Sequence, residues 1–396
     1  MNESGSSKRG HWRSRTRLVR AGREPFEQHG FINTPIYRGS TVLAPTYASL
    51  FDHSLHYTYG TKGTPTSEAL ETAWTEIAGA EGTVLAPSGL AAVTLALMTA
   101  VKAGDHLLVT DSAYRPTRAF CDRYLKRMGV ETTYFDPYLG ADVANLFRPN
   151  TVAVLAEAPG SQSFEMQDVP AIAEVAHARG LCVIMDNTWA TPLFFPPHER
   201  GVDLAVEAGT KYLSGHSDLL LGLVSANAAW YPRLRETFDL FSNSAGPEDI
   251  YLALRGLRTM ELRLRESERQ GLAMARWLAA RPEVVEVLHP ALPSHRGHDI
   301  WKRDFSGSSG LFSVILRPAP EPAVAALFDA LQLFGMGYSW GGYESLVIPF
   351  DCAPYRTATQ WKPPGPALRF QIGLEDIEDL KEDLDQGFAK FRAAQG

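Results

Sequence analysis

Apolar runs and amphipathic segments alternate through the first two thirds of the chain. Runs of strand length occur at residues 83–86, 106–110, 130–135, 152–157, 181–186, 203–207 and 219–225. Between them, segments with helical periodicity occur at residues 91–100, 115–128 and 169–179. Strands that alternate with helices in this way predict an α/β fold with a mostly parallel, doubly wound sheet.

The last third of the chain has a different pattern. A strongly helical stretch at 247–280 precedes strand-like runs at 284–288, 311–316 and 368–372 and helical segments at 321–333 and 375–394. We therefore expect a linking helix and a smaller C-terminal α+β domain at 256–396, packed on a large domain at 61–255. The linking helix carries arginines at 255, 258, 263, 265 and 269, and such a basic face is typical of a solvated surface or a subunit contact.

The first sixty residues carry little apolar surface of their own. Residues 1–12 are rich in serine, glycine and basic side chains, which predicts a disordered tail. Short apolar pieces alternate with glycine and proline at 18–49, which predicts an extended arm that packs across another subunit. The loop at 56–66 lacks the spacing of a nucleotide P-loop, and Thr66 or Ser67 is expected to cap a helix that runs to residue 78.

The composition of the 396 residues indicates a globular enzyme with more than one domain. Hydrophobic residues make up 45% of the chain, and its most apolar stretch, at 219–230, is too short to span a membrane. A formal net charge of -7 disfavours nucleic acid as a partner. Three scattered cysteines, and a basic N-terminus without the apolar core of a secretory signal, favour the cytoplasm.

Two reactive side chains follow neighbouring predicted strands. Asp186 ends the run at 181–186, where open α/β sheets place their ligands, and Lys211 follows the run at 203–207. An anion and a primary amine in these places suit a cofactor with a basic ring nitrogen and an aldehyde, which indicates pyridoxal phosphate. Taken alone, a strand-end aspartate and a surface lysine would be the better interpretation.

A possible phosphate cup, Ser88-Gly89-Leu90, opens the predicted helix at 91–100. Small residues there let backbone N–H groups approach an anion, although a plain cap is the commoner use. Together with Asp186 and Lys211, this cup resembles the fold-type I pyridoxal-phosphate enzymes, and most closely the Cys/Met-metabolism transsulfuration family with its bacterial cystathionine β-lyases. The resemblance covers nearly the whole chain, and its segments are NTPIYRGSTVL, YGTKGTPT, PSGLAA, SAYRPTRAF, EAPGSQSFEMQDVPAIAEVAH, MDNTWATP, TKYLSGHSD, HPALPSH, SWGGYESL and LRFQIGLED.

The resemblance implies a role for each matching residue. Lys211 is similar to the lysine that forms the Schiff base and moves the α-proton, Asp186 to the partner of the ring nitrogen, and Tyr114 to the tyrosine that stacks on the ring. The implied phosphate ligands are Ser88, Gly89, Leu90, Thr210, Lys62 and, from a neighbouring subunit, Tyr59. The implied substrate-binding residues are Arg369, which would grip the α-carboxylate as a two-bond fork, with Ser339, Trp340 and Tyr59.

Two positions depart from the family pattern. Thr61 stands where the family usually has an arginine for the phosphate, so Lys62 is the candidate substitute. Ala208 stands where many relatives have a hydroxyl, which puts one more phosphate contact in doubt. The histidines at 289, 295 and 298 lie in a proline-rich loop without an acidic or cysteine cluster, so a structural loop is expected and no metal site.

The segment at 339–344, SWGGYE, bears on the reaction. Bacterial β-lyases resemble SWGG here, whereas γ-lyases and γ-synthases usually have a smaller residue in place of Trp340. This favours α,β-elimination of L-cystathionine to homocysteine, pyruvate and ammonia, a step of methionine biosynthesis, with cystine or other S-substituted cysteines as further substrates. The alternatives are a γ-lyase or γ-synthase, a lyase for another cysteine conjugate, and a non-catalytic protein that has kept the fold. The resemblance also implies a homo-oligomer, a tetramer built from dimers with shared active sites.

Overall fold

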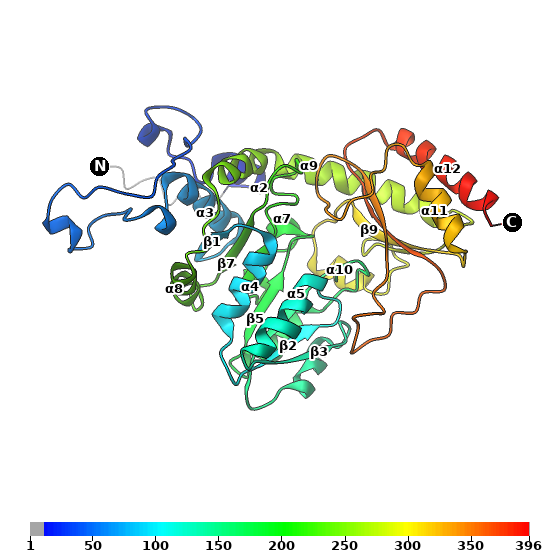
Figure 1. Ribbon diagram of the computed structural model, residues 1–396, viewed down its shortest axis with the longest axis horizontal. Coiled ribbons are helices and arrows are strands. Elements are labelled where there is room, and N and C mark those ends of the chain that lie inside the picture. The colour runs from blue at the N-terminus through cyan, green and yellow to red at the C-terminus, as the bar shows by residue number, and fades with distance from the viewer. Residues whose placement is uncertain (1–11, 396) are drawn as a thin grey trace.

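The computed structural model describes residues 12–395 and arranges them around two β-sheets (Figure 1). A seven-stranded sheet comes from the first part of the chain and a four-stranded sheet from the last part. The long helix α9 (Pro247–Ala279) joins the two parts: Leu257 packs in a core cluster of the first, and Met274 in that of the second. The predicted disorder of residues 1–12 falls, except for Trp12, outside the described residues.

The large sheet is mostly parallel. Its strand order is β1-β7-β6-β5-β4-β2-β3. The parallel strands are β2 (His106–Thr110), β3 (Glu131–Phe135), β4 (Thr151–Glu157), β5 (Cys182–Asp186) and β6 (Leu204–Glu207). Only at one edge does the direction change, because β7 (Gly222–Ala226) pairs antiparallel with both β6 and β1 (Gly82–Ala86). The predicted fold class is confirmed.

Helices cover both faces of this sheet. They are α3 (Pro65–Ala78), α4 (Gly89–Ala100), α5 (Arg115–Ala119), α6 (Val169–His177), α7 (Thr191–Phe194) and α8 (Tyr231–Phe241), with short 3₁₀ turns η5 (Gly140–Leu146) and η6 (His198–Arg200). Val183 and Met185 of β5 belong to one buried cluster, while Cys182 and Ile184 belong to another. Burial on both faces explains why the strands appear in the sequence as continuous apolar runs.

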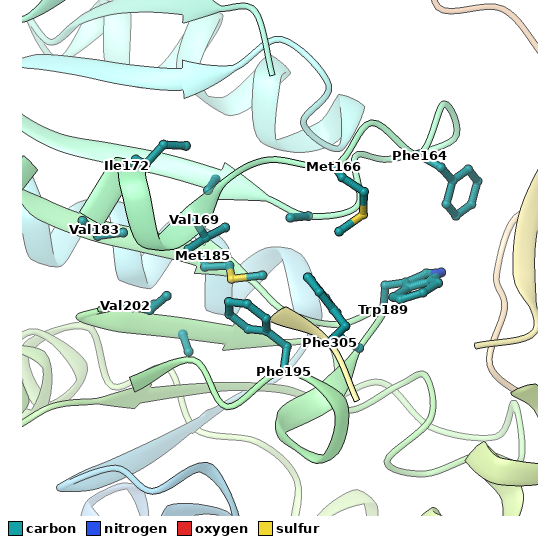
Figure 2. Close-up of a cluster of buried hydrophobic side chains, with 14 of the residues drawn as sticks. Phe164, Met166, Val169, Ile172, Val183, Met185, Trp189, Phe195, Val202 and Phe305 are labelled. Atoms are coloured by element: carbon teal, nitrogen blue, oxygen red, sulfur yellow. The ribbon is translucent and has the colours of Figure 1, made fainter. Parts of the chain in front are cut away.

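Figure 2 shows the cluster that contains Met185, which points from β5 toward Phe195 and Phe305. The rings of Phe195 and Phe305 lie 4.7 Å apart, and both side chains are buried. Burial of one side chain of this size stabilises the fold by roughly 1.5–3 kcal/mol. Because Phe305 follows α10 (His298–Asp304), this cluster also fixes the C-terminal third of the chain against the large sheet.

The smaller sheet is antiparallel, in the order β10-β11-β9-β8. Its strands are β8 (Val284–Leu288), β9 (Leu311–Leu316), β10 (Leu346–Phe350) and β11 (Ala367–Gln371), and it packs with α11 (Glu321–Ala330) and α12 (Ile377–Ala393). Strand β10 is absent from the sequence prediction, because Pro349 interrupts a short apolar run. The expected α+β arrangement is otherwise present.

The N-terminal segment differs in part from the expected arm. Helix α2 (Ser14–Arg20) buries Leu18, which is 1% exposed, in the core cluster that α3 and α9 share. Beyond it, residues 23–62 form only short turns, η1 (Pro25–Gln28), η2 (Ala48–Leu50) and η3 (Gly60–Lys62), and extend away from the sheets (Figure 1). The extended conformation therefore begins after α2, because Leu18 supplies a side chain that the core can bury.

Three local predictions need correction. The cap of α3 is Thr64 rather than Thr66 or Ser67: its hydroxyl accepts from the Ser67 N–H at 3.2 Å, and Pro65 is the first helical residue. The helix expected at 115–128 is helical from 115 to 127, but it is not α-helical throughout, because α5 passes into the π-helical stretch η4 (Phe120–Leu125). Helix α8 was not predicted. None of the helices within residues 12–395 combines the length and apolar character that a membrane span requires.

Candidate active site

Asp186 is the last residue of β5, at the carboxyl edge of the sheet. Its carboxylate accepts hydrogen bonds from the backbone N–H of Thr188 at 3.1 Å and from the Thr188 hydroxyl at 2.6 Å. The same hydroxyl accepts from the N–H of Ala208 at 2.9 Å, so Thr188 links Asp186 to the segment that leads to Lys211. Burial raises the pKa of Asp186, and the Thr188 hydrogen bonds and Lys211 oppose that shift.

Lys211 lies in a tight turn after β6. Its ammonium donates to the Ser339 hydroxyl at 2.8 Å and lies 5.2 Å from the ring centre of Trp340. Burial lowers the pKa of Lys211 to about 8; the Arg369 cation adds to this effect and Asp186 opposes it. An amine with this pKa can take up and release protons near neutral pH.

Arg369 reaches the site from β11 of the smaller sheet. One of its terminal nitrogens donates to the backbone oxygens of Tyr338 at 2.8 Å and Ser339 at 3.1 Å. Its buried Nε–H has no partner within the described residues. Although burial lowers the pKa of Arg369 to about 10, the guanidinium stays charged at neutral pH. An arginine with an unsatisfied N–H suits an incoming carboxylate.

The loop that carries Ser339 and Trp340 packs directly on the backbone of Lys211. A Cβ atom on Gly341 would lie 3.0 Å from the Lys211 carbonyl carbon and 3.0 Å from the Tyr212 nitrogen. Gly341 also has a φ of +83°, which side chains disfavour. The ring of Trp340 lies 5.6 Å from that of Tyr212. Gly341 therefore allows the close approach that brings Ser339 to the Lys211 amine.

The N-terminus of α4 lies against the same segment. Ser88 caps this helix by accepting from the Ala91 N–H at 3.1 Å, and a Cβ on Gly89 would lie 2.7 Å from the Ala208 Cβ. The N–H groups of the first turn, near Gly89 and Leu90, lie at the N-terminus of α4, and helix N-termini of this kind bind phosphate. The Thr210 hydroxyl is already engaged, because it donates to the Leu221 oxygen and accepts from the Leu221 N–H.

Tyr114 stands at the N-terminus of α5 and is 44% exposed. Its backbone N–H donates to the Glu157 carboxylate, on the last residue of β4, at 2.7 Å. Burial raises the pKa of Tyr114; Glu157 and Asp186 add to the shift and Arg369 opposes it. Because Asp186 and Arg369 both shift the pKa of Tyr114, these three residues lie in one site.

Within residues 12–395, two predicted phosphate ligands, Lys62 and Tyr59, have their contacts away from Lys211 and Asp186. The Lys62 ammonium donates to the Asp239 backbone oxygen at 3.2 Å and lies 3.6 Å from the Asp239 carboxylate on α8. Tyr59 is 50% exposed and lines a cavity of about 360 Å³ with Arg38 and Arg235. Lys62 is thus committed to an ion pair, which its position in the sequence could not predict.

The histidine loop is held by local hydrogen bonds. His289 accepts from the Ala291 N–H at 3.1 Å, and His295 accepts from the Gly297 N–H at 3.0 Å. His298 Nδ1 lies 3.0 Å from the Pro290 oxygen. Across residues 12–395, no cluster of three or more histidine, cysteine or acidic side chains has a metal-binding arrangement.

Residues 15–389 match the model of the Cys/Met metabolism PLP-dependent enzymes. The chain belongs to this family. A putative cystathionine β-lyase of Rhizobium johnstonii is 52% identical over 382 residues, 96% of each chain, and the cystathionine β-lyase MetC of Escherichia coli is 41% identical over 95% of this chain and 98% of its own. An L-alanine/L-glutamate racemase of Wolbachia pipientis is 38% identical, over 94% and 96%. The crystal structure of metB from Corynebacterium glutamicum superposes with a TM-score of 0.89 at 29% identity, over 96% and 99%.

The residues of this PLP-dependent enzyme fit its cofactor. Lys211 offers an amine of lowered pKa for the aldehyde, and Asp186 offers a carboxylate for the ring nitrogen. The first turn of α4 offers N–H groups for the phosphate, and Gly89 lets this turn lie close to the segment that leads to Lys211, since a Cβ on Gly89 would be 2.7 Å from the Ala208 Cβ. The site can therefore hold pyridoxal phosphate and, through Arg369, an amino-acid carboxylate.

Sequence reasoning missed Thr188, Glu157 and Arg263 as parts of the site. Thr188 could have been predicted from the sequence, because a hydroxyl two residues after a strand-end aspartate can donate a hydrogen bond to that carboxylate. Glu157 ends β4 and pairs in register with Asp186, which an apolar run does not reveal. The arginine-rich face that includes Arg263 is predicted to be a solvated surface or a subunit contact, but Arg263 lies against the Lys211 turn and donates to the Tyr212 carbonyl at 2.7 Å.

Proposed function

We propose that this enzyme catalyses α,β-elimination of L-cystathionine, which with water gives homocysteine, pyruvate and ammonia. The observation that carries the proposal is the position of the Lys211 amine, 2.8 Å from the Ser339 hydroxyl and 5.2 Å from the Trp340 ring centre. The names of the relatives from Rhizobium and Escherichia support it. The reaction is a carbon–sulfur lyase step of methionine biosynthesis.

Each residue has a defined task in this reaction. Arg369 binds the α-carboxylate of the substrate through its unsatisfied N–H, which fixes the orientation of the Cα–H bond. Lys211, once free as an amine, accepts the α-proton, which its pKa of about 8 permits near neutral pH. When bound, pyridoxal phosphate supplies a ring that accepts the electron pair left at Cα. Asp186 keeps the ring nitrogen protonated.

The second half of the reaction breaks the Cβ–S bond. The homocysteine sulfur leaves with the electron pair of that bond and takes a proton, for which Lys211 and the Tyr114 hydroxyl are the available donors. Trp340 lies beside the Lys211 amine, so it restricts which substrate bond can align. Water then releases the three-carbon fragment as pyruvate and ammonia.

Three alternative reactions use the same early proton transfer. A γ-lyase would cleave the other carbon–sulfur bond of cystathionine and give cysteine and 2-oxobutyrate. A racemase would return the proton to the opposite face of Cα, and the relative from Wolbachia is named for that activity on alanine and glutamate. A lyase for another cysteine conjugate would spare cystathionine and act on cystine or a related compound.

A product assay separates these reactions. Purified enzyme, supplied with pyridoxal phosphate, is incubated with cystathionine, cystine, L-alanine or L-glutamate, and 2-oxoacids, thiols and enantiomers are measured. Pyruvate with homocysteine from cystathionine is the expected result. Cysteine with 2-oxobutyrate would replace the proposal with a γ-lyase, and enantiomer exchange without thiol release would replace it with a racemase.

We also propose a homo-oligomer, a tetramer built from dimers with shared active sites, that acts in the cytoplasm. The extended segment exposes large apolar side chains, including Phe26 at 96%, Leu43 at 85% and Tyr47 at 81%. Surfaces of this kind mark protein contacts. Tyr59 follows in the same segment and would serve the phosphate site of a second subunit. Light scattering of the purified enzyme, with removal of residues 23–52 as the perturbation, tests this assembly.

A further inference from the structure

Arg263, on α9, is directed at the turn that carries Lys211. One terminal nitrogen donates to the Tyr212 carbonyl at 2.7 Å, and the other donates to the Leu213 carbonyl at 3.0 Å. The second nitrogen also donates to the Gly256 carbonyl of its own helix at 2.7 Å. The guanidinium therefore joins the two residues after Lys211 to the long helix.

The Arg263 guanidinium forms no ion pair with the described residues. No carboxylate within residues 12–395 lies within ion-pair distance of Arg263, whereas Arg265 and Arg269 of the same helix pair with Glu268 and Glu266. Burial lowers the pKa of Arg263 to about 10, so it is still charged at neutral pH. A buried cation whose partners are backbone carbonyls fixes the chain that carries those carbonyls.

Two glycines leave the room that this contact needs. A Cβ on Gly215, which has a φ of +71°, would lie 1.8 Å from a terminal nitrogen of Arg263. A Cβ on Gly256 would lie 2.5 Å from the carbonyl oxygens of both Leu213 and Ser214. The turn thus lies directly on α9, and Gly215 closes it by donating to the Lys211 carbonyl at 2.8 Å.

We propose that Arg263 is a positioning residue for Lys211: it holds the turn at 211–215 against α9, so that the Lys211 amine stays at the Ser339 hydroxyl. The loop at 339–342 packs on the same turn, since Gly341 would meet Lys211 if it had a side chain. Arg263 acts through geometry, because the cation that shifts the pKa of Lys211 is Arg369 and not Arg263.

The test compares Arg263→Gln, Arg263→Lys and the control Arg255→Gln, which changes an exposed arginine of the same helix. Three quantities are measured on the holoenzyme: the thermal unfolding midpoint, the circular dichroism of the visible cofactor band per bound cofactor, and kcat and KM. For Arg263→Gln we expect kcat to fall about tenfold or more, with KM nearly unchanged and a weaker cofactor-band dichroism. Arg263→Lys, which keeps the charge but has a single donor nitrogen in place of the planar guanidinium, should recover part of both signals.

Two results would overturn the proposal. One is an Arg263→Gln enzyme with a lower unfolding midpoint but with kcat and cofactor dichroism equal to those of Arg255→Gln, which would make Arg263 a stabilising residue only. The other is a shifted pH profile of kcat, which would make its role electrostatic. If Arg263→Gln does not fold, Arg263→Lys decides: values of kcat and dichroism equal to the control overturn the proposal, and intermediate values support it.

Discussion

The Lys211 ammonium donates to the Ser339 hydroxyl at 2.8 Å, across 128 positions of sequence. Lys211 follows β6 of the large sheet, whereas Ser339 lies in a loop before β10 of the small one. The reactive amine is therefore fixed from both parts of the molecule. Any movement of the smaller sheet relative to the larger would change the environment of the amine and, through Arg369, the carboxylate site.

The pH profile of turnover should report Lys211. Its pKa is lowered to about 8, and it must be neutral to accept the α-proton, so kcat should rise with pH through a limb near 8. In Arg369→Leu, assayed at saturating substrate, one cause of the lowered pKa is gone and the limb should move to higher pH. A limb that stays in place in this variant would assign the titration to another group.

Replacing Asp186 with Asn should cost on the order of a hundredfold or more in kcat, because an amide cannot keep the ring nitrogen protonated. Thr188→Val is the matched control, since it removes the hydroxyl that donates to the carboxylate at 2.6 Å and accepts from the Ala208 N–H at 2.9 Å, while the charge of Asp186 stays in place. We expect it to lose far less activity. Equal losses in the two variants would mean that orientation of the carboxylate, rather than its charge, limits the rate.

The apolar pattern predicted the strands well because buried parallel strands leave continuous runs. Strands β2, β8 and β9 have the predicted bounds. Contacts between distant residues leave no such signal. Lys62 meets Asp239 across 177 positions, and Arg263 meets the Lys211 turn only because α9 passes beneath it. An arginine on a solvated helix face and a buried arginine such as Arg263 give the same sequence pattern, since both stand among apolar residues of a helix.

Trp340→Gly should weaken the preference of the enzyme for cleavage of the Cβ–S bond of cystathionine over the Cγ–S bond. The side chain lies over the Lys211 amine and against Tyr212, and its removal opens the space that a γ-elimination needs. We expect the ratio of 2-oxobutyrate to pyruvate formed from cystathionine to rise about tenfold or more. Measurement of both 2-oxoacids by chromatography gives the ratio directly, and Trp340→Phe serves as the conservative control. An unchanged ratio with a lower rate would show that Trp340 only fills space.

Glu207 provides a test of stability against pH. It ends β6, is 2% exposed, and neither carboxylate oxygen has a partner in the described part of the chain. Burial raises the pKa of Glu207 well above its usual range, and Asp186 adds to the shift. The unfolded chain therefore releases this proton at lower pH than the folded chain. Between the two pKa values the folded state binds more protons, so its stability falls as pH rises.

Glu207→Gln removes the titrating carboxyl group, so the stability of the folded state should fall less as pH rises. The thermal midpoints of the variant and the native enzyme should lie close together near about pH 5 and separate as pH rises, with the variant the more stable. Glu236→Gln, the same substitution at an exposed position on α8, should follow the native enzyme at every pH. Parallel curves for native enzyme and Glu207→Gln would mean that water reaches this carboxylate and solvates its charge, because only a desolvated group couples folding to its own titration.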